Sequence, residues 1–215
     1  GLYKDDAISS VEHRANLVLL LKYGMDFIKN YTMSGWVKMP NYRLNLPDYS
    51  DRAIFEGLVN HLIHRDYTVM GGEVHIDIYD DRVELVSPGA MLDGTQIQDR
   101  DIYKVPSMRR NPVIADVFTQ LDYMEKRGSG LRKMRELTEK LPNFLQGKEP
   151  QYQTEAASFF TTFYNLNWDD NGRIPVEDVA ERVNGSDEKF GDSQKSSVKT
   201  FGDSQKSSVI HKVLR

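Results

Sequence analysis

Residues 56–67 read EGLVNHLIHRDY, and this stretch combines a helical pattern of apolar residues with polar residues at every fourth position. The expected helix covers about residues 51–66, and its buried face would be formed by Phe55, Leu58, Val59 and Leu62. Glu56, Asn60 and His64 follow one another at about 40° intervals along the border of that face. Taken alone, this spacing favours a solvated helix edge, which is common in surface helices, and the polar wall of a ligand pocket is the alternative.

The composition is that of a globular chain without cysteine. The chain has 215 residues, of which 39% are hydrophobic and 28% are charged, and its formal net charge is −4. This length suffices for one domain plus an appendage, and the acidic balance argues against a surface that coats nucleic acid. The absence of cysteine excludes disulfides, thiolate metal sites and cysteine catalysis, and it agrees with a cytoplasmic location. No apolar run approaches the roughly 20 residues that span a bilayer, so we expect no membrane partner.

Helical and strand patterns alternate on both sides of the opening stretch, which favours the α+β class. The expected elements are a helix over residues 11–30 capped by Ser9 or Ser10, short strands in WVKM (36–39) and YRLNL (42–46), a β-hairpin in EVHIDIYDDRVELVSPG (73–89), an irregular stretch over about 88–108, a helix beginning at Pro112, a basic helix after RGSGL (127–131), and a strand in ASFFTTFYNLN (157–167). Apolar and polar residues alternate in both arms of the hairpin, and Asp80-Asp81 marks its turn.

The last part of the chain has a different texture. Residues 169–215 are polar, and the sequence FGDSQKSSV occurs twice, at 190–198 and 201–209. A repeat of this period could form a helical array, but glycine and paired serines are poor helix formers, so we interpret the segment as a low-complexity linker. The closing VIHKVLR, at 209–215, resembles the beginning of a further element.

A glycine turn precedes the basic helix. Gly128, Ser129 and Gly130 would let the backbone approach a ligand closely, and the helix that follows would direct free N–H groups and its positive end at an anion. A plain tight turn explains the same residues equally well. The turn Ser87-Pro88-Gly89, read in isolation, indicates only that a strand ends there.

Four separated segments together resemble a known family. EGLVNHLIHRDY, IDIYDDRVELVSPG, RRNPVIADVF and EKRGSGLRKM span about residues 42–165, and they follow the order found in the C-terminal ATPase-like domain of the RecG-related bacterial transcriptional regulators. Members of that family are often called ATP-dependent DNA helicases. The domain is similar to the ATPase domains of gyrase, the Hsp90 chaperone, histidine kinases and the MutL repair protein. The resemblance therefore implies a two-layer α/β sandwich, in which a mixed sheet carries helices on one face.

The resemblance also assigns roles to the polar helix and the glycine turn. Glu56 would match the acid that activates the attacking water, and Asn60 would match the amide that ligates Mg²⁺. Gly128, Ser129 and Gly130 would match the turn that contacts the phosphates. ATP and Mg²⁺ are the cofactors that this assignment implies.

Other positions would bind the nucleotide less specifically. Ser87 and Gly89 lie where the wider superfamily has an aspartate turn that reads adenine, and a serine supplies no charge and less discrimination there. His64 and Arg65 belong to the HRDY signature of the family, for which a phosphate-binding and a structural role are equally open.

Arg110 and Asn111 precede the helix at Pro112 and offer two interpretations. As lid residues they would reach a phosphate. The alternative is that Asn111 caps the helix and the arginine is solvated.

The resemblance divides the chain into three parts. Residues 1–40 would be a helical lead-in from a DNA-binding domain outside this chain, residues 41–168 the ATPase-like domain, and residues 169–215 a linker followed by the start of a winged helix. DNA would be bound through domains that this chain lacks, and a homodimer is the second expected partner. The chain contains no G-x-x-x-x-G-K-[ST] phosphate loop, so a helicase motor is not expected.

Two functions follow from these observations. The first is a nucleotide-binding sensor module of a DNA-binding transcriptional regulator, with at most a weak ATPase activity. The alternative is a degenerate ATPase-like fold that binds no nucleotide and serves interaction or dimerisation. Ser87 in place of an aspartate favours the second, whereas Glu56 with Asn60 and the intact glycine turn favour the first.

Overall fold

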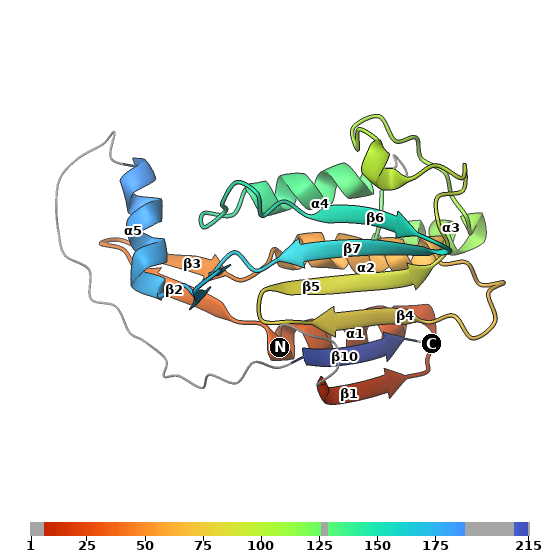
Figure 1. Cartoon of the computed structure of the whole chain (residues 1–215), viewed down its shortest axis with the longest axis horizontal. Helices are drawn as coiled ribbons and strands as arrows, with labels where there is room; N and C mark the ends of the chain where they lie inside the picture. Colours follow the sequence, from red (N-terminus) through yellow and green to blue (C-terminus); the bar gives the residue numbers. More distant parts are fainter. Residues whose placement is uncertain (1–6, 126–128, 188–208, 215) are drawn as a thin grey trace.

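A six-stranded mixed sheet forms one layer of the molecule (Figure 1). The computed structural model describes residues 7–125, 129–187 and 209–214. In spatial order the strands are β1 (Ala7–His13), β10 (Val209–Leu214), β4 (Val74–Ile78), β5 (Arg82–Pro88), β7 (Ser158–Tyr164) and β6 (Gln151–Glu155). β1 and β10 run parallel, and every other neighbouring pair is antiparallel. The predicted α+β class with a mixed sheet is thus observed, and it is consistent with an ATPase-like α/β fold.

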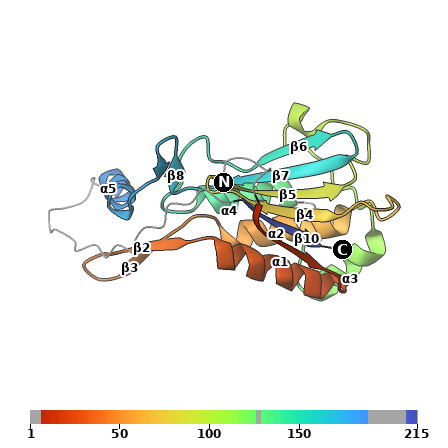
Figure 2. The ribbon, with the colours of Figure 1, turned by 60° about the horizontal axis from the view of Figure 1, so that its bottom comes forward.

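Helices cover one face of this sheet (Figure 2). They are α1 (Leu17–Tyr31), α2 (Asp51–His64), α3 (Pro112–Gln120) and α4 (Gly130–Glu139), and a short 3-10 turn, η1, covers Ile97–Asp99. The predicted helix at 51–66 is confirmed as α2, whose N-terminus is capped by the Ser50 hydroxyl accepting from the Ala53 amide at 3.3 Å. Among the described residues, no helix combines the length and the apolar character that crossing a bilayer requires.

The main hydrophobic core lies between the sheet and α2. Alternate side chains of β4 and β5 face this helix, as the predicted hairpin requires: Val74, Ile76, Ile78, Val83 and Leu85 are each at most 4% exposed. α2 itself contributes Leu58 and Leu62, which are fully buried. Because α2 is packed between the sheet and its neighbours α1 and α4, its polar residues are held in fixed positions.

A second, smaller core lies at the end of the molecule opposite α3 (Figure 1). It is built from β2 (Ser34–Lys38), β3 (Arg43–Pro47), Ile174 and α5 (Val176–Asp187). The short strands β8 (Trp168–Asp169) and β9 (Gly172–Arg173) come just before Ile174 in the chain. The buried Asp48 joins this end to the main core, since its carboxylate accepts from the Met33 amide at 2.9 Å, from Asn167 Nδ2 at 2.9 Å and from Arg173 Nη2 at 2.8 Å.

The beginning of the chain differs from the expected helix over residues 11–30. Ala7–His13 form β1, and α1 begins only at Leu17, where Asn16 rather than Ser9 or Ser10 provides the cap by accepting from the Leu19 amide. The polar residues before His13 become a strand because β10 offers them a hydrogen-bonding partner from the other end of the chain.

In the last part of the chain, two described segments form regular elements where a linker was expected. Residues 176–187 form α5, and residues 209–214 form β10 inside the main sheet instead of beginning a winged helix. The first FGDSQKSSV copy and most of the second lie outside the described residues. One further strand, β6, was not expected, because QYQTE at the sheet edge is polar throughout apart from Tyr152.

Candidate functional site

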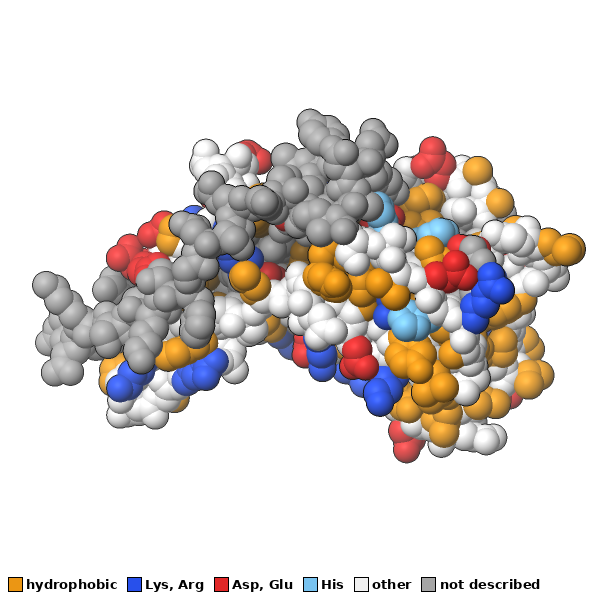
Figure 3. Space-filling view, turned by 90° about the horizontal axis from the view of Figure 1, so that it is seen from below, with side chains coloured by type: hydrophobic (Ala, Val, Ile, Leu, Met, Phe, Trp, Pro, Cys, Tyr) orange, Lys and Arg blue, Asp and Glu red, His pale blue; other side chains and the backbone are white. Residues whose placement is uncertain are grey.

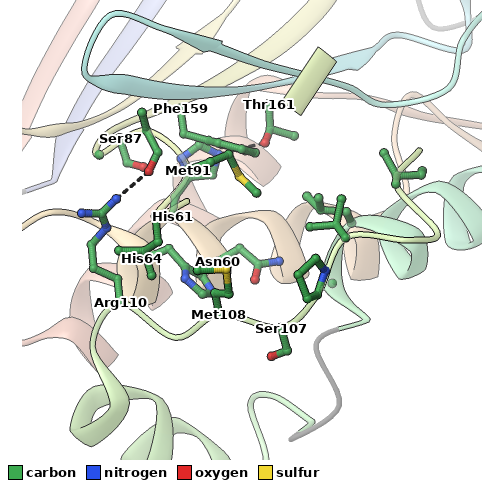
Figure 4. A pocket seen from close by; sticks show the side chains of 18 of the residues that line it. Asn60, His61, His64, Ser87, Met91, Ser107, Met108, Arg110, Phe159 and Thr161 are labelled. Atoms are coloured by element: carbon green, nitrogen blue, oxygen red, sulfur yellow. Dashed lines mark hydrogen bonds between the residues drawn. The ribbon is translucent and has the colours of Figure 1, made fainter. Parts of the chain in front are cut away.

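A pocket of about 130 Å³ opens between α2, the ends of β5 and β7, the loop 89–110 and the start of α4 (Figure 4). Its walls are mostly apolar and include Met91, Ile102, Met108, Met134 and Phe159. Its volume is below the roughly 300–1,000 Å³ of sites that enclose a drug-sized ligand, so in this conformation it is too small for a whole nucleotide.

The polar floor of the pocket is made by three buried residues from three elements. Ser87 of β5, Thr161 of β7 and His61 of α2 are each at most 2% exposed and line the pocket. His61 Nε2 lies 3.0 Å from Thr161 Oγ1, whereas His61 Nδ1 is buried and has no hydrogen-bond partner among the described residues. An orphaned buried nitrogen costs free energy, and a bound ligand could satisfy it.

Burial determines the protonation state of the two pocket histidines. It lowers the pKa of His61 to about 3, with a smaller contribution from His64. The pKa of His64 is also lowered, first by burial and then by the charges of Arg110 and Arg109. His61 is therefore a neutral imidazole at physiological pH, with one ring nitrogen that donates and one that accepts.

At the other end of the pocket, α2 and α4 touch through Asn60 and Gly130. A Cβ atom added at Gly130 would lie 2.5 Å from Asn60 Nδ2, so only glycine lets the start of α4 approach the amide this closely. Both residues line the pocket, as does Leu131 in the first turn of α4. The amide of Asn60 and the positive end of a helix thus meet at one point, which is a suitable environment for an anion.

Gly89 and Arg110 form the rim beside β5. Gly89 has φ +112°, and a Cβ there would lie 3.1 Å from the Asp66 amide nitrogen. Arg110 donates to Asp66 Oδ2 at 3.1 Å and to the carbonyl oxygen of Ala90 at 2.5 Å. These contacts hold the guanidinium at the pocket wall, where Figure 4 shows it near His64.

Glu56 does not line this pocket. Its carboxylate is 5% exposed and accepts from Arg52 Nη2 at 2.9 Å and from Lys133 Nζ at 2.8 Å. Burial alone would lower the pKa of Lys133, but its hydrogen bonds to Glu56 and Glu125 outweigh burial and raise it. Both cations contact Oε1, so the Glu56 carboxylate is engaged in ion pairs within α2 and between α2 and α4, outside the pocket lining.

Of the four remaining predicted site residues, those that the structure describes lie outside the pocket lining. Arg65 donates to the carbonyl oxygen of Gly72 and stacks over Tyr67, which places it in the loop after α2. Ser129 borders a separate surface pocket on α4, next to Lys133. Gly128 lies outside the described residues.

Asn111, the fourth of them, closes the end of α2. Its Nδ2 donates to the carbonyl oxygens of Ile63 at 2.7 Å and Arg65 at 2.8 Å. It stands at the N-cap position of α3, but its side chain makes no capping bond there. The contacts of Asn111 are therefore those of a structural link between α2 and α3.

The structure thus brings Asn60, His64, Ser87, Gly89, Arg110 and Gly130 together around one pocket. Sequence reasoning missed His61 and Thr161. His61 follows Asn60 directly, and its role depends on the neighbouring strand, which the helix pattern does not show. Thr161 could have been found from alternation within 157–167, since it faces the same side as Phe159 and Phe163.

Metal ligands are sparse here. Within the described ranges, no group of three or more histidine or acidic side chains could hold a metal ion. Asn60 supplies one neutral oxygen. A Mg²⁺ ion at this end would therefore depend on phosphate oxygens and water for its remaining ligands.

Comparison with known proteins supports an ATPase-like domain. Residues 71–163 match a protein-family model described as "Putative ATP-dependent DNA helicase recG C-terminal". The matched segment contains Ser87, Gly89, Arg110 and Gly130 but begins after α2, so Asn60 lies outside it. No curated protein sequence matches the chain.

Among solved structures, the fold is similar to that of the DIP2311 protein from Corynebacterium diphtheriae, with a TM-score of 0.58 and 18% sequence identity. The likeness covers 82% of this chain and 36% of that chain, so this chain spans about a third of its length. At this identity the likeness concerns the fold alone.

Proposed function

We propose that this chain binds ATP in the pocket between α2, β5, β7 and α4, and that it acts as the nucleotide-responsive module of a DNA-binding transcriptional regulator. The observation that carries the proposal is the pairing of a buried polar floor at one end of the pocket with the contact between Gly130 and Asn60 at the other. The family match over residues 71–163 supports the same ligand class.

The base would bind at the floor. Phe159 and Met91 offer apolar surfaces, while Ser87, Thr161 and His61 offer hydrogen-bonding groups in a buried setting. Such a combination suits a flat heterocycle with a polar edge. The orphaned Nδ1 of His61 is the floor atom that most needs a ligand partner.

The phosphates would lie at Gly130 and Asn60. The first turn of α4 supplies the positive end of a helix dipole, and Arg110 supplies a cation at the wall. Asn60 would also offer its amide oxygen to Mg²⁺, and the metal would partly neutralise the charge of the phosphates. The pocket has no acidic side chain among its described lining residues, which agrees with an anionic ligand.

Hydrolysis would be weak at best. Glu56, the residue expected to activate water, is held by Arg52 and Lys133 and lies outside the pocket lining. The module would therefore respond to occupancy by the nucleotide more than to turnover.

A whole nucleotide needs more room than the pocket now offers, and the loop 89–110 is the wall that can yield. Its middle is fixed to β6, because the Ile97 amide donates to Thr154 Oγ1 at 3.2 Å and the Thr154 amide donates to Gln98 Oε1 at 3.0 Å. Residues 100–110 would move and close over the nucleotide. This movement would give the domain two conformations with different contacts to its partners.

Isothermal titration calorimetry with ATP and Mg²⁺ tests the proposal. We expect micromolar-range binding by the wild type and its loss in Asn60→Ala and Gly130→Val. Lys148→Ala, on the surface away from the pocket, serves as the matched control. A flat titration of the wild type at concentrations that detect millimolar affinity would refute nucleotide binding.

An interaction domain is the second candidate function, and one observation favours it. The outer side of α3 and its C-cap residue carry three exposed apolar side chains, Val113, Val117 and Leu121, which are 76%, 46% and 44% exposed. Figure 3 shows hydrophobic side chains gathered at the end of the molecule that carries α3. Sedimentation of the wild type and of Val113→Glu tests this candidate: a dimer that the substitution dissociates would support it.

A further inference from the structure

We infer that His61, Thr161 and Ser87 can each donate a hydrogen bond to, or accept one from, the group at position 6 of a purine. The pocket would therefore bind a guanine nucleotide as readily as an adenine nucleotide. The inference rests on the proposed function, since it concerns the base of the nucleotide that the pocket would bind. It adds the substrate class: purine nucleoside triphosphates in general.

The composition of the floor is the first observation. A carboxylate accepts hydrogen bonds only and would fix the polarity of its partner, but no Asp or Glu is found among the described residues that line the pocket. The buried groups from β5 and β7 are instead the hydroxyls of Ser87 and Thr161. A hydroxyl donates or accepts by rotating about one bond, so each can meet an amino group or a carbonyl oxygen.

The coupling between His61 and Thr161 is the second observation. If Thr161 donates to Nε2, the proton of the neutral imidazole is on Nδ1, which then donates. If Nε2 donates to Thr161, Nδ1 is left as an acceptor. Both arrangements preserve the 3.0 Å hydrogen bond between Nε2 and Oγ1, and both leave His61 uncharged.

The unpartnered state of Nδ1 is the third observation. This nitrogen is sealed from solvent and has no partner among the described residues, so neither tautomer is favoured by a protein group at Nδ1. A base would reach this atom only once the loop 89–110 has moved, and the base would then select the tautomer. The six-amino group of adenine would meet Nδ1 as an acceptor, and the six-oxo group of guanine would meet Nδ1–H as a donor.

None of the three groups is fixed as a hydrogen-bond donor or as an acceptor. Discrimination between adenine and guanine needs at least one group that is fixed in this way. A site rejects a base when one of its buried donors faces a donor of the base, or when a buried acceptor faces an acceptor. Because the hydroxyls rotate and the imidazole changes tautomer, no such clash develops with either purine. We therefore expect the dissociation constants for ATP and GTP to agree within about threefold, a difference of less than one hydrogen bond.

Titration of the wild type, Ser87→Asp and Thr161→Val with ATP·Mg and GTP·Mg tests the inference. Ser87→Asp introduces a group that only accepts, so GTP binding should fall about 10- to 100-fold relative to ATP. Thr161→Val removes the hydroxyl that is hydrogen-bonded to His61 Nε2 and should weaken the binding of both nucleotides. Thr161→Ser keeps a hydroxyl and should retain the binding of both. Circular dichroism and thermal unfolding establish that each variant is folded.

Nitrogen-15 NMR of His61 reports its tautomer, which would not depend on the bound nucleotide if the histidine were merely structural. We expect the Nε2–H tautomer in the ATP complex and the Nδ1–H tautomer in the GTP complex. Binding of ATP with rejection of GTP, or the same tautomer in both complexes, would overturn the inference and leave the proposed function standing. Failure of both nucleotides to bind would refute the proposed function itself.

Discussion

Gly130 packs closely against the amide of Asn60 at the pocket. A double-mutant cycle can measure the coupling free energy between these two residues. In Gly130→Ala the new Cβ would meet Asn60 Nδ2 at 2.5 Å, so either the Asn60 amide or the start of α4 must shift. We expect a loss of about 1–3 kcal/mol in the free energy of unfolding. Asn60→Ala removes the obstructing amide, so the double variant should recover much of that loss. Urea unfolding measures all four proteins, and strictly additive effects would contradict the contact.

Lys212 is a buried lysine with a pH-dependent effect on stability. It lies on the helix-facing side of β10, is 3% exposed, and donates to the carbonyl oxygen of Tyr23. Burial lowers its pKa to about 8, and the charge of Asp26 acts in the opposite direction. In the unfolded chain the pKa returns to about 10.4.

The sign of the effect follows from these two values. Between them the unfolded chain binds more protons than the folded one, so the free energy of unfolding should rise with pH from about 8 towards 10, by at most about 1.4 kcal/mol per pH unit. Lys212→Met should remove this rise. Urea unfolding at pH 7.5, 8.5 and 9.5 provides the measurement, and an equal slope in both proteins would contradict the assignment.

Some functional residues could be identified from the sequence and others could not. Asn60, His64 and Gly130 carry a local signal, namely helical spacing or a glycine before a helix, and the structure places them at one pocket. Glu56 has the same helical spacing, but its side chain faces Lys133 of α4, and local spacing cannot show which helix will lie opposite. The partner of a side chain is a tertiary property.

At the scale of elements, the ion pair between Glu56 and Lys133 links α2 to α4. In Lys133→Met the buried carboxylate keeps only Arg52, and we expect the free energy of unfolding to fall by about 1–3 kcal/mol. Glu125→Gln is the matched control, because Glu125 is 64% exposed and its pair with Lys133 contributes little. Equal effects of the two substitutions in chemical unfolding would contradict a structural role for the buried pair.

The sequence predicted elements whose partners are adjacent in the chain. The hairpin of β4 and β5 was evident from alternation and a short turn, and α2 from its period. β6 forms a hairpin with the adjacent β7, and it was missed because its sequence is polar apart from Tyr152. β1 and β10 were missed because each takes its strand form from a partner far away in the chain. Pairing over such distances has no local pattern, so these strands required the structure.

At the scale of the whole molecule, Asp48 connects the smaller core to the main one. Asp48→Asn keeps the shape of the side chain but removes the charge that binds Arg173. We expect faster hydrogen exchange in β2, β3 and α5, with β4 and β5 unchanged, because the smaller core would open on its own. Exchange that accelerates uniformly through both cores would contradict this independence and would show that the molecule unfolds as one unit.

The neighbours of β1 have a consequence for the order of events during synthesis. The only strand that pairs with β1 in the described sheet is β10, and the paired residues Ser9 and Ile210 are roughly 200 positions apart. A ribosome releases residues in chain order, so β1 must wait until residues 209–214 have been synthesised before its hydrogen bonds with β10 can form. Until then, β4, β5, β7 and β6 can assemble through nearer contacts, while β4 and β1 both expose unpaired edges. The nascent chain is therefore most vulnerable to aggregation just before residues 209–214 emerge.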